Sequence, residues 1–229
     1  MVWWFRKRSD STSTSPLHDS LFGDLPLSAW PVEGAPASLT GEPWVSFARV
    51  EAEIKGGNEE HARDALKTIV AMPGLESRHY LEAWHHLRLL GVLPEVGESK
   101  RILGVVFEVP VGGGWDVLAA YADHSARYLN HSGAAIIWDH PDERFDAHTD
   151  AVLRAAQALV SRIGPWEGQR PPLSPERARL SLLTPSGLHF GQAPFDALAQ
   201  DPISAPVVAA ATKLLTDLTN MAAKPANRG

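Results

Sequence analysis

The sequence predicts an α+β protein, in which helices and antiparallel strands occupy separate stretches of the chain. Apolar residues recur every three or four positions between residues 43 and 92, which is the period of amphipathic helices. From about residue 98, β-branched and apolar runs alternate with short turns rich in Gly, Asn, Asp and Ser. Two helical stretches return at 142–163 and 206–222. The expected order is α-α-α-β-β-β-β-α-β-β-α: a helical hairpin packed on an antiparallel β-meander, with two further helices.

Composition divides the chain into four regions. Residues 1–42 are predicted to be a flexible N-terminal tail and Pro/Gly-rich linker, and 43–92 a helical subdomain. Residues 98–223 form the predicted α+β domain, and 224–229 a disordered C-terminus. Within the linker, the apolar residues around Leu21 and Phe22 leave two readings open. The segment is either an extended strap on the folded domain or a recognition segment for another protein.

The helical subdomain begins with a helix that carries an apolar stripe. This helix is expected to end at Gly56 and Gly57. Asn58 is a favourable N-cap for the next helix, which stops at Pro73–Gly74. Because so short a turn joins it to a third helix, these two helices are expected to lie antiparallel. Only one such hairpin is visible, whereas a helical solenoid needs about three stacked units. We therefore expect the hairpin to pack against the strands that follow.

The strands begin at Arg101, in RILGVVFEVPV. The trio Gly112–Gly114 is expected to be a turn, because a strand pattern follows it and not the helix that a phosphate-binding loop would require. Three more runs, DVLAAYAD, SARYLNHS and GAAIIWD, complete the meander. RLSLLTPSGLHFGQ predicts a later hairpin that turns at 185–187.

From about residue 75 onward, the element order α-β-β-β-α-β-β-α resembles that of type III secretion chaperones, and it has the general look of roadblock or profilin-like domains. The resemblance covers element order and no sequence motif. It therefore implies a fold and carries no functional argument.

Composition narrows the classes of function. Among 229 residues, 44% are hydrophobic, which is enough for a substantial core. A net charge of −6 argues against nucleic acid as a partner. The absence of cysteine excludes disulfides, thiolate metal sites and thiol nucleophiles, and it fits a cytoplasmic protein. No apolar run reaches the ~20 residues that span a bilayer. We expect no cofactor.

The stretch WDHPDERFDAHTD has the composition closest to a metal site. Its candidate ligands are His140, His148, Asp142 and Asp146. The competing interpretation is a helix start enriched in carboxylates by the helix dipole. If the metal reading holds, the protein is a metal-dependent enzyme or a ligand sensor, with His189 as a further candidate member.

Other catalytic patterns are weak. Glu82 and His85 have the i, i+3 spacing of di-iron bundles, but a second pair is absent from the sequence. No G-x-S-x-G motif is present. His124 and His131 fall in successive predicted turns, about 20 Å apart at opposite ends of the sheet, which prevents them from sharing a metal.

The eight tryptophans supply the leading functional hypothesis. Trp115, Trp138 and Trp166 fall at predicted element ends, where an indole often lies at an interface. The sequence thus favours a non-enzymatic, cytoplasmic, adaptor or chaperone-like module that binds a protein segment or a second copy of itself. Its binding surface is expected at the sheet edge or beside the last helix.

The first residues offer an alternative. Aromatic side chains stand directly before basic ones, in the order Trp3, Trp4, Phe5, Arg6, Lys7, Arg8. Aromatic side chains favour the headgroup region of a membrane, and basic side chains bind anionic lipids. On this reading the tail is a weak anchor that places the protein at the inner membrane surface.

Overall fold

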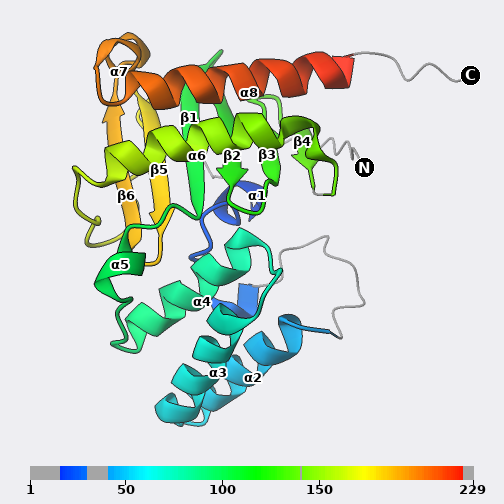
Figure 1. Ribbon diagram of the computed structural model, residues 1–229, viewed down its shortest axis with the longest axis vertical. Helices are drawn as coiled ribbons and strands as arrows, with labels where there is room; N and C mark the ends of the chain where they lie inside the picture. Colours follow the sequence, from blue (N-terminus) through cyan, green and yellow to red (C-terminus); the bar gives the residue numbers. More distant parts are fainter. Residues whose placement is uncertain (1–15, 30–40, 140, 224–229) are drawn as a thin grey trace, which may run out of the picture.

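The computed structural model describes residues 16–29, 41–139 and 141–223 and has an α+β fold (Figure 1). One six-stranded antiparallel sheet forms its centre, with strand order β4-β3-β2-β1-β5-β6. The predicted helices and strands all occur in the predicted order, which confirms the fold class.

The helical unit consists of α2 (Trp44–Lys55), α3 (Glu59–Ala71) and α4 (Ser77–Leu89). Its core contains Phe47, Leu66 and Leu87, one from each helix. These buried positions belong to the apolar stripes that the sequence predicts. Figure 1 shows the unit at one end of the sheet, with α4 nearest to the strands.

The sheet is built from two hairpin-connected runs. The strands are β1 (Gly104–Val111), β2 (Gly114–Tyr121), β3 (Ala126–Leu129), β4 (Ala135–Trp138), β5 (Ala178–Thr184) and β6 (Gly187–Ala193). The predicted late hairpin joins the meander because β5 pairs with β1, with Glu108 opposite Arg179. Gly112 and Gly113, both with positive φ, turn the chain between β1 and β2.

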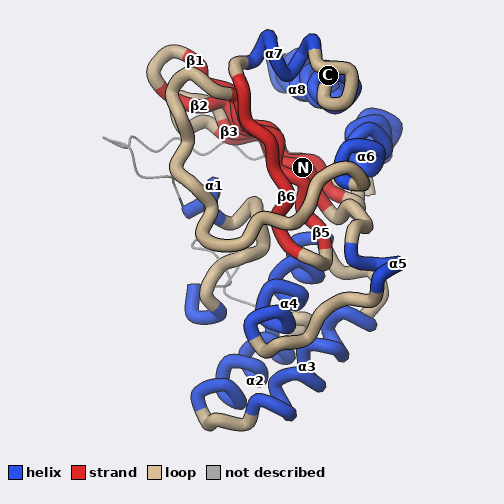
Figure 2. Tube along the Cα trace, turned by 90° about the vertical axis from the view of Figure 1, so that its left-hand side faces the viewer, coloured by secondary structure: helices blue, strands red, loops and turns tan. Residues whose placement is uncertain are grey.

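Two long helices cover one face of the sheet. They are α6 (Asp146–Val160) and α8 (Ala205–Ala223), and Figure 2 shows both on the same side of the strands. Val105 and Phe107 of β1 point to this face, where they pack with Val152 and Leu214. A 3-10 turn, η2 (Glu143–Phe145), precedes α6, so the helix begins later than the sequence indicates.

Residues 16–29, which lie within the predicted N-terminal tail and linker, pack on the other face of the sheet (Figure 2). We call this segment the strap. Leu21 and Phe22 anchor it, with 0% and 4% of their surfaces exposed, because apolar side chains gain by leaving water. Residues 1–15 and 30–40 of the predicted tail and the predicted disordered C-terminus at 224–229 lie outside the described residues.

Several short elements were not predicted. They are α1 (Pro16–Asp19), η1 (Leu27–Ala29), α5 (Val96–Ser99) and α7 (Phe195–Gln200). Within the described parts of the chain, no helix combines the length and apolarity needed to cross a membrane.

Candidate binding groove beneath the strap

The strap packs between α4 and the sheet, and we call the surface that it covers the groove. Leu21 and Phe22 belong to an apolar cluster that β1, β2, β5 and α4 complete. Its main members from those elements are Val106, Ala119, Tyr121, Leu183 and Leu81. The sheet therefore forms the floor of the groove and α4 forms one wall.

Side chains of the groove bind the main chain of the strap. The hydroxyl of Tyr121 donates to the Leu21 carbonyl at 2.7 Å. Glu82 Oε2 accepts from the Leu25 amide at 3.2 Å, while His86 Nε2 lies 3.3 Å from the Leu25 carbonyl and 3.0 Å from Glu82 Oε1. Burial raises the pKa of Glu82, with His86 opposing the shift. These bonds satisfy peptide groups that would otherwise lose water.

A charged cluster is buried under the start of the strap. Glu108 of β1 and Arg179 of β5 are 0% and 1% exposed, and Glu108 Oε2 lies 3.9 Å from Arg179 Nε. His18 Nε2 lies 2.8 Å from Glu108 Oε1. Burial opposes protonation of His18, but its bonds to Asp19 and Glu108 outweigh burial and raise its pKa. A charge in this setting is stable only with partners, so the cluster helps to fix the strap in one position.

Arg170, from the long loop before β5, lies over the strap. Its guanidinium carbon is 3.5 Å from the centre of the Phe22 ring, a cation–π contact. The same guanidinium lies 3.4 Å from Asp19 Oδ1 and 3.6 Å from Asp24 Oδ2. Burial raises the pKa of Asp24, and Arg170 opposes this shift. One cation thus contacts three side chains of the strap.

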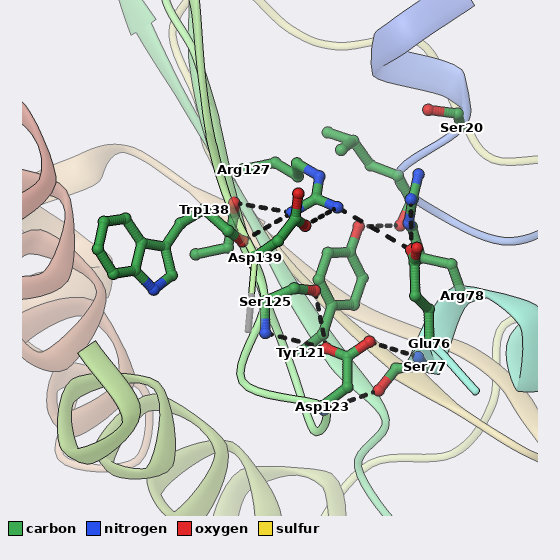
Figure 3. A network of polar contacts seen from close by, with 12 residues as sticks. Ser20, Glu76, Ser77, Arg78, Tyr121, Asp123, Ser125, Arg127, Trp138 and Asp139 are labelled. Carbon is green, nitrogen blue, oxygen red and sulfur yellow. Dashed lines mark hydrogen bonds and ion pairs between the residues drawn. The ribbon is translucent and has the colours of Figure 1, made fainter. Parts of the chain in front are cut away.

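A polar network fixes α4 to the sheet and so holds the wall of the groove. Figure 3 shows Asp123, after β2, directed at the first turn of α4. Asp123 Oδ2 accepts from the Ser77 amide at 2.7 Å, and the Asp123 amide donates to Ser77 Oγ at 3.0 Å. This exchange satisfies an amide at the start of the helix, where the dipole favours a carboxylate.

The second half of the same network is ionic (Figure 3). Arg127 of β3, 5% exposed, lies 2.7 Å from Asp139 and 3.9 Å from Glu76. Arg78 of α4 lies 2.6 Å from Glu76. Burial would raise the pKa of Glu76, but Arg78, together with His79 and Arg127, outweighs burial and the pKa is lowered. The helical unit and the sheet are therefore joined by charges as well as by apolar packing.

The candidate metal ligands contact different partners. Asp142 pairs with Arg144 at 2.7 Å, and His148 Nε2 lies 2.9 Å from Asp217. Asp146 Oδ2 lies 3.3 Å from His124 Nδ1. Across the described ranges, no three His, Asp or Glu side chains are placed to hold one metal ion. His140 lies outside the described residues, so the four-residue site stays a prediction.

His189 forms part of a hydrogen-bonded chain that the sequence did not suggest. Its Nδ1 lies 3.3 Å from the Ile163 carbonyl and its Nε2 lies 3.1 Å from Ser186 Oγ. A donating Nδ1 would leave Nε2 to accept from the hydroxyl, as in serine hydrolases. However, the Ser186 amide already donates to the Ser99 carbonyl at 3.0 Å. That amide is therefore not available to an oxyanion, and the arrangement is best explained as support for the turn.

The three candidate binding tryptophans differ in exposure. Trp138 is 2% exposed, and its Nε1 donates to the Asp142 carbonyl, so the ring belongs to the core under the helices and not to a surface. Trp115 is half-buried beside the cluster that holds the strap. Trp166 is 48% exposed and packs edge-on against Phe190 of β6, while its amide donates to the Leu188 carbonyl. The membrane candidates Trp3, Trp4, Arg6, Lys7 and Arg8 lie outside the described residues.

Comparison with models of protein families, with curated proteins and with solved structures finds no match to this chain. The groove is therefore interpreted from its own geometry. Sequence reasoning missed Glu108 and Arg179. The available signal was a charged residue in the middle of an otherwise apolar strand, which indicates either a buried ion pair or a strand face that contacts something other than a helix.

Proposed function

We propose that the protein is a non-enzymatic interaction module that binds a short segment of another protein in the groove between α4 and the sheet. In this structure its own strap occupies that groove. The partner segment displaces the strap, so the strap acts as an internal competitor. This proposal retains the protein-interaction hypothesis drawn from the sequence and moves the binding surface to a different place.

The observation that supports the proposal is the way the groove holds the strap. Groove side chains bind the main chain at Leu21 and Leu25, and an apolar pair fills the centre. Sites that recognise peptides likewise combine hydrogen bonds to the peptide main chain with pockets for its side chains. The strap also contributes no strand to the sheet, so the order of the six strands does not depend on it.

The test separates the strap from the rest of the chain without removing any residue. A specific protease site is inserted within residues 30–40 of the full-length protein, and the chain is cleaved after folding. A covalently attached competitor acts at a high effective concentration, so cleavage makes the strap replaceable. A fluorescent peptide of residues 16–29 is then added, and its anisotropy is measured.

We expect saturable binding to the cleaved protein and weak binding to the uncleaved protein. A matched peptide with Leu21→Ala and Phe22→Ala should bind neither. Circular dichroism of the cleaved protein verifies that the fold is retained. If the cleaved protein stays folded and the peptide does not bind, the strap is a permanent part of the fold and the proposal is wrong.

A further inference from the structure

The two central positions of the strap are selected by shape and by charge. Leu21 is fully buried among apolar side chains of the sheet and α4. Phe22 places its ring 3.5 Å from the guanidinium carbon of Arg170 and 5.5 Å from the ring of His18. An aliphatic side chain at position 22 would lose the cation–π contact, so the groove favours Leu followed by an aromatic residue.

The next position accepts glycine alone. Gly23 has φ +60°, a left-handed conformation that residues with a side chain adopt only with strain. A Cβ atom there would lie 2.5 Å from Leu81 Cβ and 3.0 Å from the Arg78 carbonyl oxygen. Both atoms belong to the rigid part of α4 and not to the end of a flexible side chain. The close approach of strap and helix therefore requires the absence of a side chain.

The positions around this core carry matching charge. Asp19 and Asp24 lie on either side of the apolar pair, and both contact Arg170. Arg88 of α4 adds a second favourable charge near Asp24. Ser20, between Asp19 and Leu21, is 0% exposed, which limits that position to a small side chain. Arg170 and Arg88 thus offset part of the cost of burying the Asp24 carboxylate, whose pKa burial raises.

We infer that the groove recognises the pattern Asp-small-Leu-Phe-Gly-Asp, as it stands in residues 19–24, in a segment of a different protein. The inference rests on the proposed function and specifies its partner: a segment that turns at a glycine, with an acidic residue at each end and Leu-Phe-Gly within. The contacts of Asp19 and Asp24 with Arg170 and the glycine-only contact with α4 carry the assignment.

A peptide library tests this pattern on the cleaved full-length protein. The library consists of peptides of residues 16–29 in which positions 19–24 are randomised, and it is selected for binding. We expect enrichment of Leu and Phe at positions 21 and 22, of Gly at 23 and of Asp or Glu at 19 and 24. Binders of unrelated sequence would overturn the pattern and leave the proposed function standing. A folded protein that selects no peptide would overturn both.

Single changes sharpen the result. A peptide with Gly23→Ala should bind at least roughly tenfold more weakly, since φ and the clash both oppose it. The matched control is Ser28→Ala, an exposed position that should leave affinity unchanged. In the protein, Arg170→Gln should weaken binding of the natural peptide roughly tenfold, and exposed Arg162→Gln should not.

A second experiment tests whether the partner is another copy of the same protein. Intact protein is concentrated and its mass in solution is measured by light scattering, with Gly23→Val as a variant that cannot seat its strap. A dimer of the intact protein that the variant does not form would assign the groove to the strap of a second copy and overturn the inference of a different protein. A monomer in both cases agrees with the inference.

Discussion

The face of the sheet under α6 and α8 and the face under the strap bury different kinds of side chain. The helix-covered face is filled by aliphatic and aromatic residues from β1, β5 and both helices. The strap-covered face buries Glu108, Arg179 and Arg127 beside its apolar residues. Apolar packing is non-directional and contributes stability, whereas buried charges tolerate few arrangements. We therefore expect the first face to contribute most of the stability and the second to fix the position of the strap.

The largest effect is expected from the helix-covered face. Leu214→Ala removes a fully buried side chain of α8 and should lower the free energy of unfolding by about 4 kcal/mol, from lost burial and the cavity left behind. Urea denaturation measures it. Exposed Thr212→Ala in the same helix is the matched control and should change stability by no more than about 0.5 kcal/mol. A loss below that size for Leu214→Ala would remove the contrast between the faces.

A somewhat smaller loss is expected from the charged cluster. Glu108→Ala leaves buried Arg179 and His18 without their carboxylate and should cost about 3 kcal/mol of unfolding free energy. Glu98→Ala serves as the control, because Glu98 pairs with Arg101 in an exposed position and should cost less than about 1 kcal/mol. If both variants are equally stable, the buried charges do not hold the strap.

The smallest effect is a local opening of the strap as the pH rises. Burial raises the pKa of Asp24 and of Glu82, and bonds to Asp19 and Glu108 raise that of His18 against its burial. A group whose pKa is higher in the docked state binds protons on docking. Docking should therefore be most favourable near pH 4 and weaken as the pH rises through the three raised pKa values, the last of them above 6.5.

A single thiol can measure this opening, because the chain has no cysteine of its own. Ser20→Cys places a thiol where the wild-type side chain is fully buried. The alkylation rate of this thiol in the protein is divided by the rate for a free peptide of residues 16–29 with the same change. This ratio cancels the effect of pH on the reactivity of the thiol itself. We expect this ratio to increase with pH. A ratio that stays constant or decreases would contradict the expected loss of docking at high pH.

The fold was predictable because its signals are local. The stripes of α2, α3 and α4 and the alternating runs of the strands can be read within windows of ten to twenty residues. Helices of four to six residues, such as α1 and α7, are too short to show a period, and they were missed. The pairing of β5 with β1 joins residues about seventy positions apart, so no local pattern indicates it.

The groove was only partly predictable, for the same reason. The sequence left open whether the segment around Leu21 is a strap or a recognition segment, and the structure places it on the sheet. The pairs Glu108–Arg179 and Arg170–Asp24 depend on contacts across the whole chain. Trp138 was expected at a surface and is instead buried. Its position at the end of a strand suggested a surface, but pairing with Ala126 turns the ring toward the helices.

The contact between the Trp166 amide and the Leu188 carbonyl has a consequence for self-association. β6 is the last strand of the sheet, and the outward main-chain groups of such a strand can recruit a strand from a neighbouring molecule. The segment that carries Trp166 already fills one of those acceptors. A neighbouring chain that extends the sheet must first detach the indole from Phe190, which makes edge-to-edge polymerisation less favourable.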